Sequence, residues 1–164
     1  MRAYVAVGSN LGDRWGNLAL AARLLRAAPL AAVTRASRVY DTEPVGPPQP
    51  RYLNAVLELE TGRPPAALHR LLREVEEEAF RDRRAGLRWG ARTLDLDLLL
   101  WGDAVVREPA LTVPHPRMAR RRFVLAPLSE LAPGLVVPGT GATVAALLEA
   151  APPLAVVPVG LYPL

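Results

Sequence analysis

The chain has 164 residues, of which 51% are hydrophobic, and a formal net charge of +4. That length and composition suffice for one domain with a sizeable hydrophobic core. The absence of cysteine excludes a disulfide framework, and the absence of lysine excludes a phosphate site built on a P-loop lysine. The N-terminal apolar run is too short for a secretory signal or a membrane span, so we expect a cytoplasmic protein without a membrane partner.

Hydrophobic periodicity predicts six elements in the order strand, helix, strand, strand, helix, strand. They span residues 2–7, 14–28, 33–42, 52–61, 65–80 and 93–101. Asp13 is the expected N-cap of the first helix and Pro29 its stop. This β-α-β-β-α-β order predicts a ferredoxin-like α+β fold, with both helices on one face of an antiparallel sheet.

Residues 102–164 extend this predicted core. We expect a hairpin-like piece near 104–106, an apolar segment at 123–128 and a short helix at 143–150. Residues 151–164 carry no motif that can be interpreted. No repeat or linker interrupts the chain, so residues 1–164 are expected to form a single domain.

Positive charge concentrates in one part of the chain. Residues 81–122 hold ten arginines against five acids, which gives +5, whereas the remainder holds ten against eleven, which gives −1. An arginine side chain is a planar fork that matches phosphate oxygens, so this part indicates a nucleotide or a nucleic acid as partner. For any single arginine, a solvated surface position is the better interpretation.

The strand at 93–101 carries two aspartates, Asp95 and Asp97, between leucines. Side chains alternate along a strand, so the leucines should face the core while both carboxylates point together from the other face. Residues at i and i+2 lie roughly 6.6 Å apart, close enough to share one hard cation. A solvent-facing strand edge is the weaker alternative, because like charges this close repel unless a cation compensates them.

Arginines gather ahead of this pair. Arg92 precedes Asp95 by three residues, and four more stand upstream: Arg81, Arg83, Arg84 and Arg88. Phosphoryl transfer is mostly a matter of positioning and of neutralising charge on phosphate oxygens, for which magnesium and several arginines are suited. A nucleoside triphosphate substrate is therefore expected.

Three further features are less specific. Tyr52 and Asn54 share one face of a strand, where a ring beside an amide suits a flat heterocycle, although tyrosine on a strand is usually packing. His115 stands among arginines, where a structural role and a hydrogen bond to phosphate are about equally plausible. The Gly-Ser-Asn turn at 8–10 fits either a phosphate-binding loop or a tight turn before a capped helix.

Five sequence blocks occur in order over most of residues 1–135. They are G-S-N-L-G-D at 8–13, Y-x-T-x-P-x-G-P at 40–47, Y-L-N-A-V at 52–56, R-W-G-x-R-T-L-D-L-D at 88–97 and L-T-V-P-H-P-R-M at 111–118. Together they resemble the 6-hydroxymethyl-7,8-dihydropterin pyrophosphokinases. The resemblance implies a ferredoxin-like α+β fold, two Mg²⁺ ions, and transfer of diphosphate from ATP to the pterin alcohol in folate biosynthesis, with AMP as leaving group.

The resemblance also implies roles for individual residues. Asp95 and Asp97 would ligate both magnesium ions. The pterin site would comprise Thr42, Pro44, Val45, Tyr52, Asn54, Trp89 and Phe123. The ATP site would comprise Glu76, Arg83, Arg92, Leu98, Thr112, His115 and Arg121. The catalytic residues would be Arg81, Arg83, Arg92, Asp95 and Asp97.

The chain departs from the family pattern in two places. The family usually has G-R-x-R ahead of the tryptophan, where this chain has F-R-D-R-R; Arg81 and Arg83 are the preferred equivalents, with Arg84 as the alternative. Ala110 and Pro116 stand where some members carry nucleotide-contacting residues, so the adenine contacts are not assigned. The sequence identifies no general base, and we expect a monomer.

Two other functions compete with this interpretation. Ferredoxin-like sheets commonly bind single-stranded RNA, but the chain has only nine aromatic residues and lacks the stretch that stacks bases in such modules, so we expect no nucleic acid partner. A magnesium-dependent nucleotidyltransferase or phosphohydrolase would use the same aspartate pair. The pterin-site pattern at 52–56 argues against it.

Overall fold

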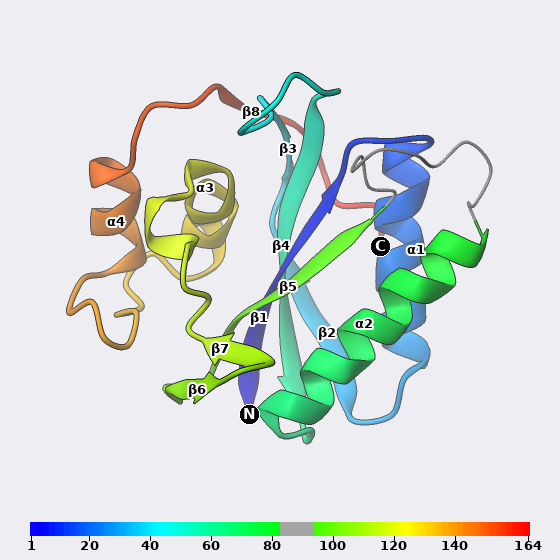
Figure 1. Cartoon of the computed structure of the whole chain (residues 1–164), viewed down its shortest axis with the longest axis horizontal. Coiled ribbons are helices and arrows are strands. Elements are labelled where there is room, and N and C mark those ends of the chain that lie inside the picture. Colours follow the sequence, from blue (N-terminus) through cyan, green and yellow to red (C-terminus); the bar gives the residue numbers. More distant parts are fainter. Residues whose placement is uncertain (83–93) are drawn as a thin grey trace.

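The computed structural model describes residues 1–82 and 94–164. A six-stranded antiparallel sheet runs through the molecule in the order β5-β1-β4-β3-β8, and β2 also pairs with β4 (Figure 1). Its strands are β1 (Arg2–Ser9), β2 (Ala31–Ala36), β3 (Val39–Thr42), β4 (Tyr52–Thr61), β5 (Asp95–Trp101) and β8 (Val156–Gly160). A separate hairpin pairs β6 (Val106–Glu108) with β7 (Leu111–Val113).

Helices cover both faces of the sheet (Figure 1). One face carries α1 (Arg14–Ala27) and α2 (Pro65–Asp82), as the ferredoxin-like order predicts, and that order is confirmed. The opposite face carries α3 (Arg122–Leu131), on which α4 (Val144–Ala150) packs. Asp13 caps α1 as expected, since its side chain accepts a hydrogen bond from the Gly16 amide at 2.9 Å. No helix in the described ranges combines the length and apolar character needed to cross a membrane.

Each face of the sheet has its own hydrophobic core. Ala3, Val5 and Val7 of β1 pack with α1 and α2, whereas Tyr4 of the same strand packs with α3. This alternation follows from the period of two in a strand. Leu94, Leu96 and Leu98 all lie in the first core, as expected for the leucines that flank the two aspartates.

The strand expected at 33–42 is divided in two. Ser37 lies between β2 and β3 and bonds twice to Val56 of β4: its amide donates to the Val56 carbonyl, and its hydroxyl accepts from the Val56 amide, both at 2.9 Å. The side chain thus takes the place of a backbone partner and interrupts the ladder. The alternation of apolar residues does not reveal such an insertion.

The structure refines the expectations for the C-terminal part. The hairpin lies at 106–113 rather than near 104–106, with its turn at Pro109 and Ala110. The apolar segment at 123–128 is helical, as part of α3. Residues 156–160 form β8, which no motif indicated, because β8 is defined by its pairing with β3 more than 110 residues earlier. The helix expected at 143–150 is confirmed as α4, capped by Thr143.

Candidate active site

The site is built on a row of residues across three neighbouring strands. Gly8 of β1 is paired with Asn54 of β4 on one side and with Asp95 of β5 on the other. Neighbouring strands lie about 4.8 Å apart, so this register places the Cα atoms of Asn54 and Asp95 about 10 Å apart. Because Gly8 has no side chain, the Asn54 amide can lie close over it: a Cβ at this position would come within 2.6 Å of Asn54 Oδ1.

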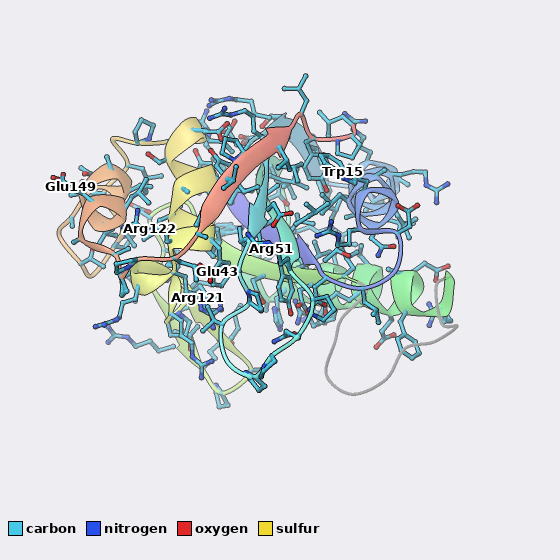
Figure 2. All side chains as sticks on the ribbon, turned by 90° about the horizontal axis from the view of Figure 1, so that it is seen from above. Trp15, Glu43, Arg51, Arg121, Arg122 and Glu149 are labelled. Atoms are coloured by element: carbon cyan, nitrogen blue, oxygen red, sulfur yellow. The ribbon has the colours of Figure 1, made fainter. Side chains whose placement is uncertain are left out.

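A cavity of about 380 Å³ opens over this row on the face of the sheet that carries α3. Its lining combines strand residues with the segment before α3 and the end of β3, where Arg121 and Glu43 lie (Figure 2). The residues are Ala6, Val7, Gly8, Thr42, Glu43, Val45, Tyr52, Asn54, Asp95, Asp97, Arg117, Arg121, Phe123 and Val124. The cavity thus brings together most of the predicted pterin residues and both predicted magnesium ligands.

The two aspartates lie at one end of the cavity. Both are half-buried and line it, whereas Leu94, Leu96 and Leu98 are buried on the other face, so the predicted orientation is confirmed. Among the described residues no group of three or more acidic or histidine side chains converges as a metal site. Mg²⁺ is commonly held by one or two carboxylates, with substrate phosphates and water completing its shell. The pair therefore fits a magnesium site that the substrate completes.

Asn54 and two rings also line the cavity. Asn54 is 9% exposed, and its Nδ2 donates to the Thr42 hydroxyl at 2.7 Å. Within the described ranges its Oδ1 accepts no hydrogen bond, so an acceptor and the second amide hydrogen face the cavity. Tyr52 and Phe123 also line the cavity, as does Val45, but Pro44 does not. Amide and rings together suit a flat ring with donors and acceptors on its edge.

The proline-rich loop at 43–51 forms one wall and is tied down at several points. The Asn10 side chain donates to Gln49 Oε1 at 2.9 Å and to the Pro50 carbonyl at 3.3 Å. At the other end Glu43 pairs with Ala155: its Oε1 accepts from the Ala155 amide at 2.7 Å, and its own amide donates to the Ala155 carbonyl. Asn10 therefore supports the turn and the wall, which favours the structural interpretation of the Gly-Ser-Asn block.

A second cavity of about 250 Å³ adjoins the first, with Asp97 lining both. Its other lining residues are His69, Leu98, Pro109, Ala110, Leu111, Thr112, His115 and Pro116. Three predicted ATP residues, Leu98, Thr112 and His115, thus meet around a largely apolar slot. The His115 Nδ1 accepts from the Arg117 amide at 3.1 Å, so the proton of the neutral ring resides on Nε2. Burial lowers the pKa of His115, and Arg121 and Arg117 lower it further against the opposing effect of Asp97.

Besides Pro44, two predicted residues in the described ranges lie away from both cavities. Glu76 Oε2 accepts from the Leu96 amide at 2.7 Å and Oε1 pairs with Arg73 at 3.1 Å; burial raises the pKa of Glu76 to about 7. Arg81 lies in the last turn of α2 rather than in a loop, and it pairs with Glu78 at 2.6 Å. Five other residues of the predicted arginine-rich stretch lie outside the described residues: Arg83, Arg84, Arg88, Trp89 and Arg92.

Gly8, Asn10 and Glu43 were not predicted to shape this site. Gly8 stands in a quoted block, but its importance comes from the register, since a Cβ there would lie 2.6 Å from Asn54 Oδ1 and 3.6 Å from the Tyr52 ring. The Gly-Ser-Asn block could have indicated Gly8 and Asn10, because both residues stand in it. Nothing in the sequence pattern connected Glu43 to residue 155.

Replacing Gly8 with Ala is expected to weaken pterin binding by about tenfold or more, because the new methyl group displaces the Asn54 amide in a packed site. Affinity for ATP should change little. Calorimetric titration of each ligand measures the two effects separately. Gly134→Ala is the matched control, since a Cβ there meets nothing within 4 Å. Unchanged pterin affinity in Gly8→Ala would show that the Asn54 position does not matter.

Comparisons with known proteins cover most of the chain. Residues 4–133 match the model of the family described as 7,8-dihydro-6-hydroxymethylpterin-pyrophosphokinase (HPPK). A 2-amino-4-hydroxy-6-hydroxymethyldihydropteridine pyrophosphokinase of Bacillus subtilis is 45% identical over 130 residues, which are 79% of this chain and 77% of that protein. The protein of the same name from Pseudomonas aeruginosa is 42% identical over 152 residues, 92% of each chain.

Solved structures agree in fold. The HPPK-DHPS of Plasmodium falciparum superimposes with a TM-score of 0.71 at 12% sequence identity, over 91% of this chain and 45% of that one. This chain therefore spans less than half of that protein, and a likeness at such low identity shows the fold alone. The family model and the relatives at 42 to 45% identity decide the assignment: the chain belongs to the 7,8-dihydro-6-hydroxymethylpterin-pyrophosphokinase family.

Proposed function

We propose that this chain transfers the diphosphate group of ATP to 6-hydroxymethyl-7,8-dihydropterin, which yields AMP and the pterin diphosphate used in folate synthesis. The observation that carries the proposal is the row across β4, β1 and β5. It brings a hydrogen-bonding amide and a carboxylate pair into the lining of one cavity, on the two strands that flank Gly8, with the Cα atoms of Asn54 and Asp95 about 10 Å apart. A pterin bound at the amide can extend its hydroxymethyl group toward the carboxylates.

Recognition of the pterin falls to the end of the cavity at Asn54. The ring edge would take the second hydrogen of Asn54 Nδ2 and donate to its Oδ1, while the hydrogen bond to Thr42 fixes the amide plane. Tyr52 and Phe123 would hold the ring faces, with Val45 at the edge. By the family pattern we also assign Pro44 and Trp89 to this site.

The nucleotide would lie on the other side of the aspartates. The slot walled by Leu98, Ala110 and Pro116 suits the flat apolar faces of a nucleotide base, and the Nε2 proton of His115 is available to an oxygen of ribose or phosphate. Thr112 adds a hydroxyl at the same place. We further propose that Glu76 and Arg121 contact ATP, and that Arg81, Arg83 and Arg92 act on its phosphates.

Asp95 and Asp97 would hold two Mg²⁺ ions together with the polyphosphate. When bound, these ions would neutralise charge on the phosphate oxygens and increase the acidity of the pterin hydroxyl. In the transfer, the hydroxyl oxygen forms a bond to the β-phosphorus and gives up its proton to water, the bond from that phosphorus to the oxygen it shares with the α-phosphate breaks, and AMP leaves. The side chains of this site would orient the two substrates in line for that exchange. Such positioning is the main contribution of a protein to phosphoryl transfer.

A product analysis tests the proposal. With ATP, Mg²⁺ and the pterin alcohol, chromatography should show AMP and pterin diphosphate formed in equal amounts, and neither without the pterin. Formation of ADP would indicate a simple kinase. Release of AMP or phosphate without the pterin would indicate the phosphohydrolase alternative, and no turnover of any kind would reject the function.

A further inference from the structure

Arg117 lines the cavity that contains Asn54 and the aspartates, but none of the roles above includes it. It precedes a single 3₁₀ turn, Met118–Arg120, and Arg121 follows that turn. Both arginines line the same cavity, together with Asp95 and Asp97. The cavity therefore has two guanidinium groups at its charged end.

The backbone that carries Arg117 is firmly anchored. The His115 amide donates to the Leu99 carbonyl of β5 at 2.9 Å, and Met118 is 1% exposed in the core beneath α3. The Arg117 amide itself donates to His115 Nδ1. Residues on both sides are thus fixed to the sheet, which places Arg117 at a defined point of the cavity rim.

The guanidinium of Arg117 is left without a partner in the described ranges, where no hydrogen bond, ion pair or ring contact involves it. The neighbouring arginines, in contrast, have partners. Arg122 donates to the carbonyls of Ala151 and Pro152, and Arg121 lies over the Phe123 ring, 5.5 Å from its centroid. A planar fork with five donors is left exposed toward the cavity.

Arg117, Arg121 and His115 lie close enough to one another for their charges to interact. Burial lowers the pKa of Arg121, and Arg117 lowers it further by repulsion, against the opposing effect of Asp97. Arg117 has the same effect on His115. Two guanidinium groups within electrostatic reach of each other repel until an anion lies between them, and two forks match the oxygens of a phosphate chain.

The position of Arg117 also indicates which phosphates it meets. It lines the cavity with Asn54, Tyr52 and Phe123, but it does not line the slot with Leu98, Thr112 and His69. We infer that Arg117 binds the diphosphate group once it is attached to the pterin, and so adds a product contact beside Arg121, whose proposed contact with ATP would be to that same diphosphate. This inference rests on the proposed function.

Binding of two ligands that differ only by the diphosphate tests the inference. Calorimetry at fixed Mg²⁺ would measure the dissociation constants of the pterin alcohol and of the pterin diphosphate. In Arg117→Ala, affinity for the diphosphate should fall about tenfold, because a charge-assisted hydrogen bond is lost, while affinity for the uncharged alcohol stays within twofold. Arg117→Lys keeps the charge but loses the fork, so it should lie between.

Arg120→Ala is the matched control, because Arg120 is exposed on the same turn and lines neither cavity. It should change neither dissociation constant. Equal weakening of alcohol and diphosphate in Arg117→Ala, or no change in either, would overturn the inference. If the unmodified protein binds both ligands and turns over ATP, the proposed function stands whatever the result for Arg117→Ala. If it does neither, the proposed function itself has failed.

Discussion

Replacing Asp97 with Asn is expected to lower kcat/KM by about 10³- to 10⁴-fold, which corresponds to about 4 to 5.5 kcal/mol of transition-state stabilisation. The change keeps the shape of the side chain and removes the charge that a cation requires. Asp97 lines both cavities, so it stands between the two proposed substrates. Loss of a metal-clamping carboxylate there should affect the transition state far more than the affinity for pterin.

The free protein should tolerate this change. Asp97 is repelled by Asp95 on the same face of β5 but attracted by Arg121 and His115, so removing its charge should leave the melting temperature nearly unchanged. A fall in activity without a fall in stability therefore separates a functional role from a structural one. Asp103→Asn is the control, since Asp103 is exposed in the turn after β5 and lines neither cavity. Near-normal turnover of Asp97→Asn would refute the magnesium proposal.

The parts of the fold that sequence periodicity predicted are those formed by local pattern. Alternation placed β4 and the described part of β5, and the Asp13 cap placed the start of α1. Pairing over long distances was not visible in the same way. Ser37 breaks the expected strand by bonding to Val56, and β8 exists because β3 supplies its partner.

The residues of the site can be separated in the same way, into those that local pattern predicted and those that depend on long-range pairing. The two aspartates were predictable, because a spacing of two in a strand fixes their common face before any tertiary contact is known. The relation of Asn54 to Gly8 depends on the register between β1 and β4, which a single sequence does not determine. Glu43 and Arg117 became visible only when segments distant in the sequence met around one cavity.

Replacing Asn54 with Ala is expected to weaken pterin binding by about 10²- to 10³-fold. Asn54 is nearly buried and offers one donor and one acceptor to the cavity beyond its bond to Thr42. Each pterin group left without its partner in a closed site costs about 1 to 3 kcal/mol, and a site built around hydrogen bonds rejects ligands that cannot complete them. Affinity for ATP should stay nearly unchanged, because Asn54 does not line the second cavity.

The size of the Asn54→Ala effect includes any loss of packing, so a second variant is needed to isolate the hydrogen bonds. Asn54→Asp keeps the shape and an acceptor oxygen but removes both amide hydrogens, including the one given to the Thr42 hydroxyl. It should weaken pterin binding nearly as much as Asn54→Ala does. Glu60→Ala, an exposed change on the same strand, should have no effect on either ligand. If calorimetry shows that Asn54→Asp binds pterin normally, the amide donor has no part in recognition, and the shape and the acceptor oxygen of the side chain are sufficient. If ATP affinity falls instead of pterin affinity, the two cavities have been assigned to the wrong substrates.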